Sequence, residues 1–216
     1  MDTKIIFHGS GVIVSKPDIR RSRADTDFGM GFYCTEDEEL AKEWACDDTH
    51  SGYMNCYEMD LSELKILNLN SDDYSTLNWL ALLVNNRSTR VRVPLQREMI
   101  SWITKNYLID ISDYDVIIGY RADDSYFDII NYFLMNTISY EQLSSALTLG
   151  DWGDQFVLKS EKAYSQIRFI EATTVDHRVY YPKRMKRDEK ARADFFSMIK
   201  EVDMKGTYIR DLIMKK

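Results

Sequence analysis

The chain has 216 residues, of which 44% are hydrophobic and 29% are charged, and its formal net charge is −7. This length and balance are typical of one soluble globular domain, or one and a half, with a sizeable core. An acidic chain is poorly suited to non-specific binding of duplex nucleic acid, although a local basic patch is compatible with that charge. We expect no membrane partner, since no run approaches the roughly 18 apolar residues of a membrane helix. The first residues also lack the features of a signal peptide.

The three cysteines are odd in number and have no metal-ligand spacing with the three histidines. We therefore expect no bound metal and a reducing, cytoplasmic location.

The first quarter of the chain predicts two short strands, a loop and a helix. Residues 3–7 are an apolar strand, and residues 16–23 are a loop that contains Pro17 and four cations. Residues 32–35 are an aromatic-rich strand. Thr35 is then expected to cap a helix over residues 36–45, whose first turn is acidic.

The rest of the chain alternates strands and helices. Further strands are expected at 52–59, 65–69, 114–120, 155–159 and 166–172, and helices at 74–86, 94–107, 123–136, 140–149 and 160–164. Ser139 is the expected cap of the helix over 140–149. After Pro182 the composition becomes charged, which predicts helices at 183–202 and 207–216. We therefore expect a domain at 1–181 and a helical C-terminal extension at 182–216.

Two glycine-containing motifs lie close together near the start of the chain. The triplet HGS at 8–10 ends the first strand, and DFGMGFYCT occupies 27–35. Gly29 and Gly31 predict unusual dihedral angles or a close backbone approach. An ordinary turn before a core strand would explain either motif alone, but their combination indicates a binding site.

Together these motifs resemble the ADP-ribosyltransferase superfamily, on the branch of the poly(ADP-ribose) polymerases and diphtheria toxin. They are most similar to a bacterial branch with an HGS start, a DFGxGFYxT core and a late strand that carries Gln. The resemblance runs, with gaps, from residue 4 to about residue 170. It implies an α+β fold with a split antiparallel sheet pair, inserted helices and a helical C-terminal extension. It also implies NAD as the substrate.

The resemblance implies a triad of His8, Tyr33 and Gln155. His8 would bond the adenine-side ribose, and Tyr33 would offer its ring face to nicotinamide. Gly9 would let its peptide groups approach the nicotinamide amide, and Ser10 would add a hydrogen bond there.

Further residues are expected around the NAD molecule. At least one of Arg20, Arg21 and Arg23 would contact the pyrophosphate, and the alternative for each is a solvated surface cation. Trp44 lies eleven positions after Tyr33 and would stack on nicotinamide, or would be a core tryptophan. The remaining NAD-binding candidates, from the core motif, are Phe32 and Thr35. The polar segment 85–92, with three arginines, is expected to be an exposed loop near the substrate mouth.

Gln155 stands where related enzymes usually carry Glu, and we weighed it against Glu161 and Glu171. Gln155 follows a glycine-rich loop and heads a strand, whereas Glu161 lies in a helical turn and Glu171 ends a strand without such a loop. A glutamine can orient a ribose hydroxyl but cannot ionise. This disfavours chain elongation and leaves mono-transfer. The variant Gln155→Glu is expected to keep or raise NAD hydrolysis.

The loop before Gln155 is the expected acceptor contact. Arginine-modifying relatives place an acid at the position of Gly153, which has no side chain, so arginine is disfavoured as the acceptor. Asp151 and Trp152 would touch the acceptor, or would form an exposed turn anchored by the aromatic ring.

The leading hypothesis is a cytoplasmic bacterial mono-ADP-ribosyltransferase acting as a toxin of a toxin–antitoxin or phage-defence system. Its acceptor would be an unidentified protein or nucleic acid, and a cognate antitoxin would be its partner. The alternative is a catalytically weak or inactive module that binds NAD or a partner.

Overall fold

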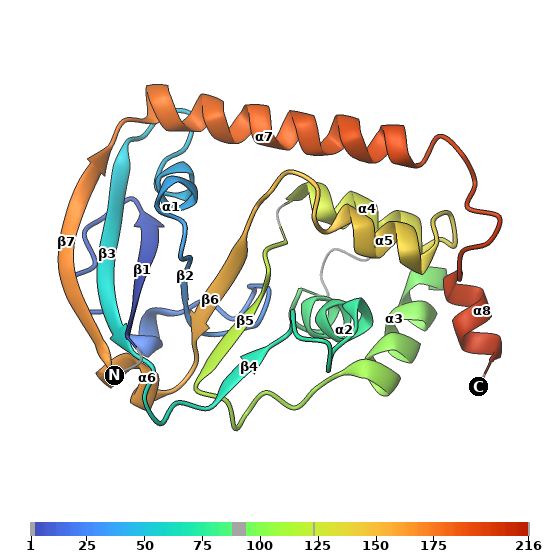
Figure 1. Ribbon diagram of the computed structural model, residues 1–216, viewed down its shortest axis with the longest axis horizontal. Coiled ribbons are helices and arrows are strands. Elements are labelled where there is room, and N and C mark those ends of the chain that lie inside the picture. Colours follow the sequence, from blue (N-terminus) through green and yellow to red (C-terminus); the bar gives the residue numbers. More distant parts are fainter. Residues whose placement is uncertain (1–2, 88–93, 123, 216) are drawn as a thin grey trace.

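Two β-sheets lie side by side in the molecule, and most of the helices gather beside the second sheet (Figure 1). The computed structural model describes residues 3–87, 94–122 and 124–215. This part of the chain is a mixed α+β fold, as predicted. No described helix is long and apolar enough to cross a membrane.

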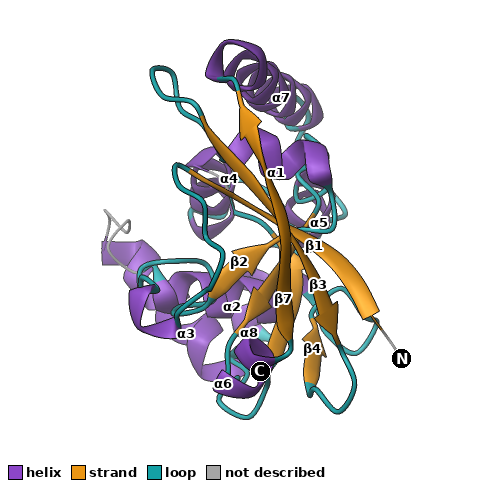
Figure 2. Ribbon diagram, turned by 90° about the vertical axis from the view of Figure 1, so that its left-hand side faces the viewer, coloured by secondary structure: helices purple, strands orange, loops and turns teal. Residues whose placement is uncertain are grey.

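The first sheet is antiparallel, and its strands lie next to one another in Figure 2. In spatial order they are β1 (Thr3–Ser10), β3 (Gly52–Asp60) and β7 (Ile167–Val175). Strand β1 runs three residues further than predicted, because its pairing with β3 continues to Ser10 and Tyr53. The HGS triplet therefore lies within a strand.

The second sheet is mixed. Its strands in spatial order are β2 (Phe32–Cys34), β6 (Asp154–Leu158), β5 (Val116–Tyr120) and β4 (Ile66–Asn68). Strands β4 and β5 are parallel, so the predicted antiparallel pairing is wrong at this edge. The chain between them forms α2 (Thr76–Asn86) and α3 (Pro94–Tyr107), and such a long crossover is what a parallel pair requires.

The two sheets meet through one narrow backbone bridge. The N–H of Phe7 donates to the carbonyl of Thr35 at 2.8 Å, and the N–H of Thr35 donates to the carbonyl of Phe7 at 2.9 Å. Buried apolar side chains from both sheets pack around this contact, namely Ile6, Phe32, Tyr57, Met59, Val116, Phe156 and Leu158. The bridge brings the motif on β1 next to the motif that leads into β2.

Helix α1 (Glu38–Trp44) begins later than predicted. Asp37 is its cap, with its carboxylate accepting from the N–H groups of Glu39 and Leu40. The prediction of Thr35 as the cap is therefore wrong. The hydroxyl of Thr35 accepts from the N–H of Asp37 instead, at 3.1 Å.

The largest core lies between the second sheet and the helices beside it. The helices that contribute to this core include α2, α3, α4 (Asp124–Leu134) and α5 (Tyr140–Ala146). Ser139 caps α5 as predicted. Its hydroxyl accepts from the N–H of Gln142, whose side chain accepts from the N–H of Ser139.

After β6 the chain forms a short helix, α6 (Glu161–Ser165). Strand β7 follows it and leads into a long helix, α7 (His177–Met198). Helix α7 begins six residues before the predicted start, since Asp176 caps it and Pro182 lies inside it. The predicted division between residues 181 and 182 thus falls within α7. This helix crosses from the end of β7 over α1 to α4, and α8 (Ile209–Met214) ends the chain beside α3 (Figure 1).

Candidate active site

A cavity of about 280 Å³ lies where β1, β2, β6 and α1 come together. Six of the predicted site residues line it, namely His8, Gly9, Arg23, Tyr33, Trp44 and Gln155. The cavity wall also contains Asp25, Thr26, Asp27, Arg87, Arg121 and Ala122. The fold therefore brings residues from both sheets, and from both the HGS and the DFGMGFYCT motif, to one cavity.

His8 is held from two sides. Its Nδ1 lies 2.7 Å from the carbonyl oxygen of Tyr33, and its ring lies 4.4 Å from the ring of Phe32. A carbonyl can only accept, so Nδ1 carries the proton, and Nε2 of the neutral ring is an acceptor. Burial lowers the pKa of His8, which favours this neutral form.

Gly9 faces the cavity with its backbone. Phe7, two residues earlier, directs its N–H and C=O toward Thr35 and away from β3. Alternate residues of a strand direct their peptide groups to the same side, so those of Gly9 also point away from β3. A Cβ at Gly9 would meet the carbonyl oxygen of Ala41 at 2.0 Å. The missing side chain lets α1 pack directly on β1, which brings Trp44 to the cavity.

Tyr33 is anchored at its hydroxyl. The hydroxyl accepts from the N–H of Phe28 at 2.9 Å and lies 2.7 Å from the carbonyl of Gly29 and 2.8 Å from the hydroxyl of Thr26. Burial raises the pKa of Tyr33. The hydroxyl is therefore engaged within the protein, and Tyr33 lines the cavity.

Unusual dihedral angles or a close approach were predicted for the two glycines of the second motif, and each glycine meets one of these needs. Gly29 has a φ of 71°, which a residue with a side chain rarely adopts. A Cβ at Gly31 would lie 2.7 Å from Val157 on β6. The Lys159 ammonium group holds the same turn by donating to the carbonyls of Phe28 and Met30.

Trp44 lies at the end of α1, and the Arg121 guanidinium group covers one face of its ring at 3.8 Å. Its indole N–H is buried without a hydrogen-bond partner among the described residues. Trp44 and Arg121 both line the cavity, so a ligand there would lie beside an aromatic ring that already stacks on a cation.

Gln155 is 4% exposed and contacts the buried carboxylate of Asp27, which is 5% exposed. The side-chain NH₂ of Gln155 donates to Asp27 at 2.5 Å. The same carboxylate accepts from Arg87 at 2.8 Å and from the N–H of Ala122 at 3.0 Å. Neither Glu161 nor Glu171, the alternatives to Gln155, lines this cavity.

Sequence reasoning missed the roles of Asp27, Arg87 and Arg121. Asp27 opens the second motif, and Arg121 directly follows the strand over 114–120, so their positions were the available signals. Arg87 was placed in an exposed loop, whereas its side chain is 16% exposed and pairs with Asp27. Residues 88–93 of that predicted loop lie outside the described residues.

Five predicted NAD-binding residues do not line the cavity. The Ser10 hydroxyl bonds to the backbone of Val12, and the Arg20 guanidinium group pairs with Asp18 beside a separate hollow. Arg21 lines that same hollow. Phe32 supports the His8 ring from the core, and Thr35 forms the bridge between the sheets.

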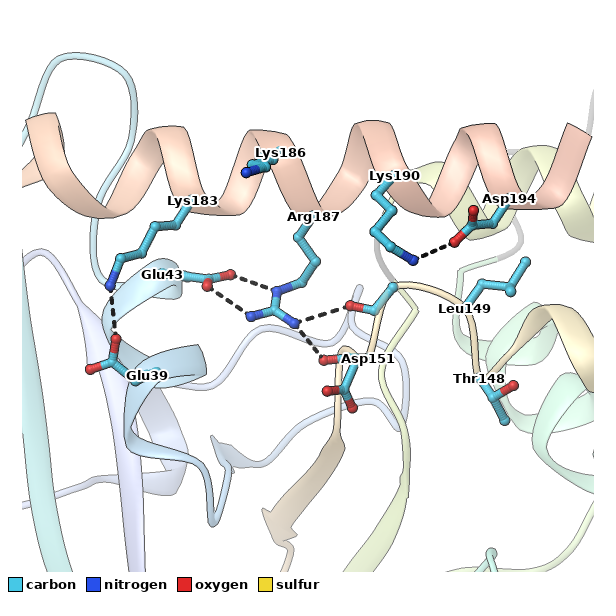
Figure 3. A pocket seen from close by; sticks show the side chains of 11 residues that line it. Glu39, Glu43, Thr148, Leu149, Asp151, Lys183, Lys186, Arg187, Lys190 and Asp194 are labelled. Atoms are coloured by element: carbon cyan, nitrogen blue, oxygen red, sulfur yellow. Dashed lines mark hydrogen bonds and ion pairs between the residues drawn. The ribbon is translucent and has the colours of Figure 1, made fainter. Parts of the chain in front are cut away.

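The loop before Gln155 lies under α7, not at the cavity. Asp151 lines a second hollow of about 640 Å³, whose charged residues largely pair with one another (Figure 3). Trp152 is 3% exposed and packs in the main core. The expectation that Trp152 touches an acceptor is therefore corrected, because its ring is buried in the core; the loop around it turns at Gly150 and Gly153, which have φ of 81° and 62°.

Fold and site together define a mixed α+β protein with a small polar cavity between two sheets. The chain belongs to the family described as "Protein of unknown function (DUF3990)", whose model matches residues 4–169. The match includes every cavity residue and ends near the start of β7, before α7 and α8. No curated protein and no solved structure matches the chain.

Proposed function

We propose that the protein is a mono-ADP-ribosyltransferase that cleaves the nicotinamide–ribose bond of NAD. The observation that carries this proposal is the meeting of His8, Tyr33 and Gln155 around one cavity, although they come from three strands in two sheets. The two sheets would then correspond to the split sheet pair of an ADP-ribosyltransferase fold, with one parallel pair at its edge.

The cavity fits one end of NAD. Its volume of about 280 Å³ is near the lower end of the range of ligand pockets, roughly 300–1,000 Å³. We assign the nicotinamide and its ribose to this space, and the pyrophosphate to its mouth beside Arg23. Gly9 offers its peptide groups to the nicotinamide amide, and Tyr33 offers its ring face.

His8 and Gln155 have complementary tasks in this proposal. Nε2 of the neutral His8 ring accepts from a hydroxyl of the adenine-side ribose. The side-chain oxygen of Gln155 accepts from the 2′-hydroxyl of the reacting ribose. That hydroxyl lies next to the carbon on which positive charge develops in an oxocarbenium-like transition state.

The bond between the ribose carbon C1′ and the nicotinamide nitrogen breaks, and its electron pair leaves with nicotinamide. A lone pair of the acceptor forms the new bond to C1′, and the acceptor's proton passes to solvent. Gln155 cannot take up that proton, since an amide does not ionise. We therefore assign mono-transfer to an acceptor that is already nucleophilic, and to water in its absence.

The cellular setting follows the family resemblance. We assign the activity to the cytoplasm, with a protein or nucleic-acid acceptor, and we place it in a toxin–antitoxin or phage-defence system with a cognate antitoxin. A search for adducts with the mass of ADP-ribose in cells that express the protein would identify the acceptor.

Release of nicotinamide from NAD tests the proposal directly. Wild-type protein should release nicotinamide with time, and Gln155→Ala should lower turnover more than it weakens NAD binding. Gln166→Ala is the matched control, because Gln166 is partly buried, bonds to the carbonyl of Ser62 and lies outside the cavity. Binding of NAD without release of nicotinamide would favour the alternative, a module that binds NAD without cleaving it. This alternative is tested because Gln155 cannot ionise, whereas related enzymes usually carry Glu at its position.

A further inference from the structure

Asp27 is the most deeply buried charge in the cavity wall, and the roles assigned above do not use it. Its carboxylate accepts hydrogen bonds from three separate segments: Arg87 after α2, the N–H of Ala122 after β5, and Gln155 on β6. Arg87 also supplies a compensating positive charge at 2.8 Å. A carboxylate with three donors from three segments is suited to hold those donors in place.

The contact with Asp27 determines how the amide of Gln155 is turned. An ionised carboxylate only accepts hydrogen bonds, so the group that lies 2.5 Å away must be the side-chain NH₂. The side-chain oxygen of Gln155 then points elsewhere and has no hydrogen-bond partner among the residues that the structure describes. Since Gln155 lines the cavity, this oxygen is the part available to a ligand.

The same contact explains why position 155 carries an amide. A carboxylate there would face the carboxylate of Asp27 at close range in a buried place, and like charges so close cannot both be ionised at low cost. The sequence alone suggested that Gln155→Glu would keep or raise NAD hydrolysis. The neighbouring Asp27 reverses that expectation.

We propose that Asp27 is a positioning residue that turns the carbonyl of Gln155 toward the reacting ribose. The negative charge of Asp27 also polarises the Gln155 amide, because the side-chain NH₂ of Gln155 donates a hydrogen bond to it. This polarisation makes the side-chain carbonyl oxygen of Gln155 a stronger acceptor. Asp27 and Gln155 together thus supply a fixed, partly negative oxygen at the ribose. This inference rests on the proposed function, since it names a residue that supports the same reaction.

The test compares nicotinamide release by wild type, Asp27→Asn, Gln155→Glu and the double variant Asp27→Asn/Gln155→Glu. Asp27→Asn should lower kcat about tenfold or more with a smaller change in KM, since the amide of Gln155 is no longer fixed in one orientation. Gln155→Glu should lose at least as much near pH 8. The double variant restores an amide–carboxylate pair and should recover part of the loss, because the new NH₂ group takes the place of the oxygen that also accepts from the N–H of Ala122.

The pH profile of Gln155→Glu gives a readout that a merely structural role would not move. As the pH falls, the new carboxyl group and Asp27 should share one proton. The protonated carboxyl group can donate to Asp27 and present its carbonyl to the cavity, as Gln155 does. Nicotinamide release relative to wild type should therefore rise from pH 8 to pH 5.5, and the double variant should not show this rise.

Other groups near position 155 affect all variants alike. Asp27 and Arg87 contact each other beside it, and the remaining titratable or charged side chains on the cavity wall are His8, Arg23, Asp25, Tyr33 and Arg121. Dividing each rate by the wild-type rate at the same pH removes their common contribution.

Two results would overturn the inference: full activity of Asp27→Asn, or a double variant no better than the poorer single variant. If a variant is too unstable to assay, thermal midpoints at pH 8 and pH 5.5 test the same pair, because Gln155→Glu should be relatively more stable at the lower pH.

These midpoints also distinguish failure of the proposed function from failure of the pairing of Asp27 with Gln155. A wild type that releases no nicotinamide would end the proposed function, whereas equal pH dependence of the midpoints would end the pairing of Asp27 with Gln155.

Discussion

The ring of His8 is kept in one protonation state by its surroundings. Burial lowers its pKa, and the carbonyl of Tyr33 accepts from Nδ1, so the neutral ring presents Nε2 as an acceptor. A neutral imidazole is the form that can accept from a sugar hydroxyl. The same environment makes the folding stability sensitive to acid, because the unfolded chain can protonate His8 freely.

The stability contribution of neutral His8 should disappear below neutral pH. The unfolded histidine titrates near about 6.5, and the folded value is lower, so the unfolded state binds more protons between the two values. The contribution is complete above about pH 6.5 and is lost as the pH falls through the folded value.

The variant His8→Gln measures this contribution, because glutamine does not titrate and keeps a donor for Tyr33. The thermal midpoint of wild type minus that of His8→Gln should shrink between pH 7.5 and pH 5. A difference that stays constant over this range would mean that His8 is not held neutral by the fold. All other titrating groups are common to the two proteins and cancel in the comparison.

At the scale of elements, the position of α1 depends on two glycines. A Cβ at Gly9 would lie 2.0 Å from the carbonyl oxygen of Ala41, and a Cβ at Gly52 would lie 1.8 Å from that of Ala45. Both contacts are with backbone, in α1 at Ala41 and at its C-cap at Ala45, and backbone cannot turn aside as a side chain can. Helix α1 therefore sits directly on β1 and β3, and this places Trp44 against Arg121.

Gly9→Ala should displace α1 and lower the free energy of unfolding by about 1–3 kcal/mol, as overpacking in a tight core does. Gly11→Ala is the matched control, since a Cβ there meets nothing within 4 Å, and its effect should stay within about 0.5 kcal/mol. Urea denaturation measures both. Equal stability of the two variants would show that α1 has room to move.

Arg187 of α7 connects this helix to α1 and to the loop at Gly150 and Asp151 (Figure 3). Its guanidinium group donates twice to Glu43 of α1, at 3.0 Å each, and also to the carbonyls of Gly150 and Asp151 at 3.1 Å and 2.9 Å. Glu43 is 2% exposed whereas the Arg187 side chain is 25% exposed, so the carboxylate is the buried member of this ion pair and depends on Arg187 for compensation.

Arg187→Ala should lower the free energy of unfolding by about 3–5 kcal/mol, because it leaves a buried carboxylate unpaired. The double variant Glu43→Gln/Arg187→Ala should recover part of this loss. Arg178→Ala is the control on the same helix. Its side chain is 78% exposed and pairs with Asp176, so its loss should be at most about 1 kcal/mol. Urea denaturation that finds equal losses for Arg187→Ala and Arg178→Ala would contradict the buried clamp.

Local patterns predicted most of the elements and part of the site. Pro94 and the apolar spacing after it gave the helix over 94–107, and Ser139 gave the start of α5. The motif residues His8, Tyr33 and Gln155 do share a cavity. The contact of Asp27 with Gln155 could not be predicted, because these residues are 128 positions apart and meet only through the pairing of distant strands. The parallel pairing of β4 was missed for the same reason.

At the scale of the whole molecule, the C-terminal part is joined to the rest by several contacts. Ser139 donates to Asp203 at 2.8 Å, and the N–H of Thr207 donates to Glu141 at 2.8 Å. Ile209 of α8 is 1% exposed and belongs to the same core as the helices beside the second sheet. These contacts predict that residues 182–216 unfold together with residues 1–181.

Ile209→Ala tests this directly. Removing a fully buried side chain should lower the free energy of unfolding by about 2–5 kcal/mol. Met214→Ala, on the same helix but 76% exposed, is the control and should have little effect. All four tryptophans lie before residue 182, and Trp152 has a ring contact with the extension, through Arg187 at 5.9 Å, so the fluorescence reports mainly on the predicted N-terminal domain. In one cooperative unit, Ile209→Ala lowers the urea midpoint seen by tryptophan fluorescence and by circular dichroism equally. A fluorescence midpoint that stays at the wild-type value, while circular dichroism shows an earlier loss of helix, would instead make the C-terminal extension a separate folding unit.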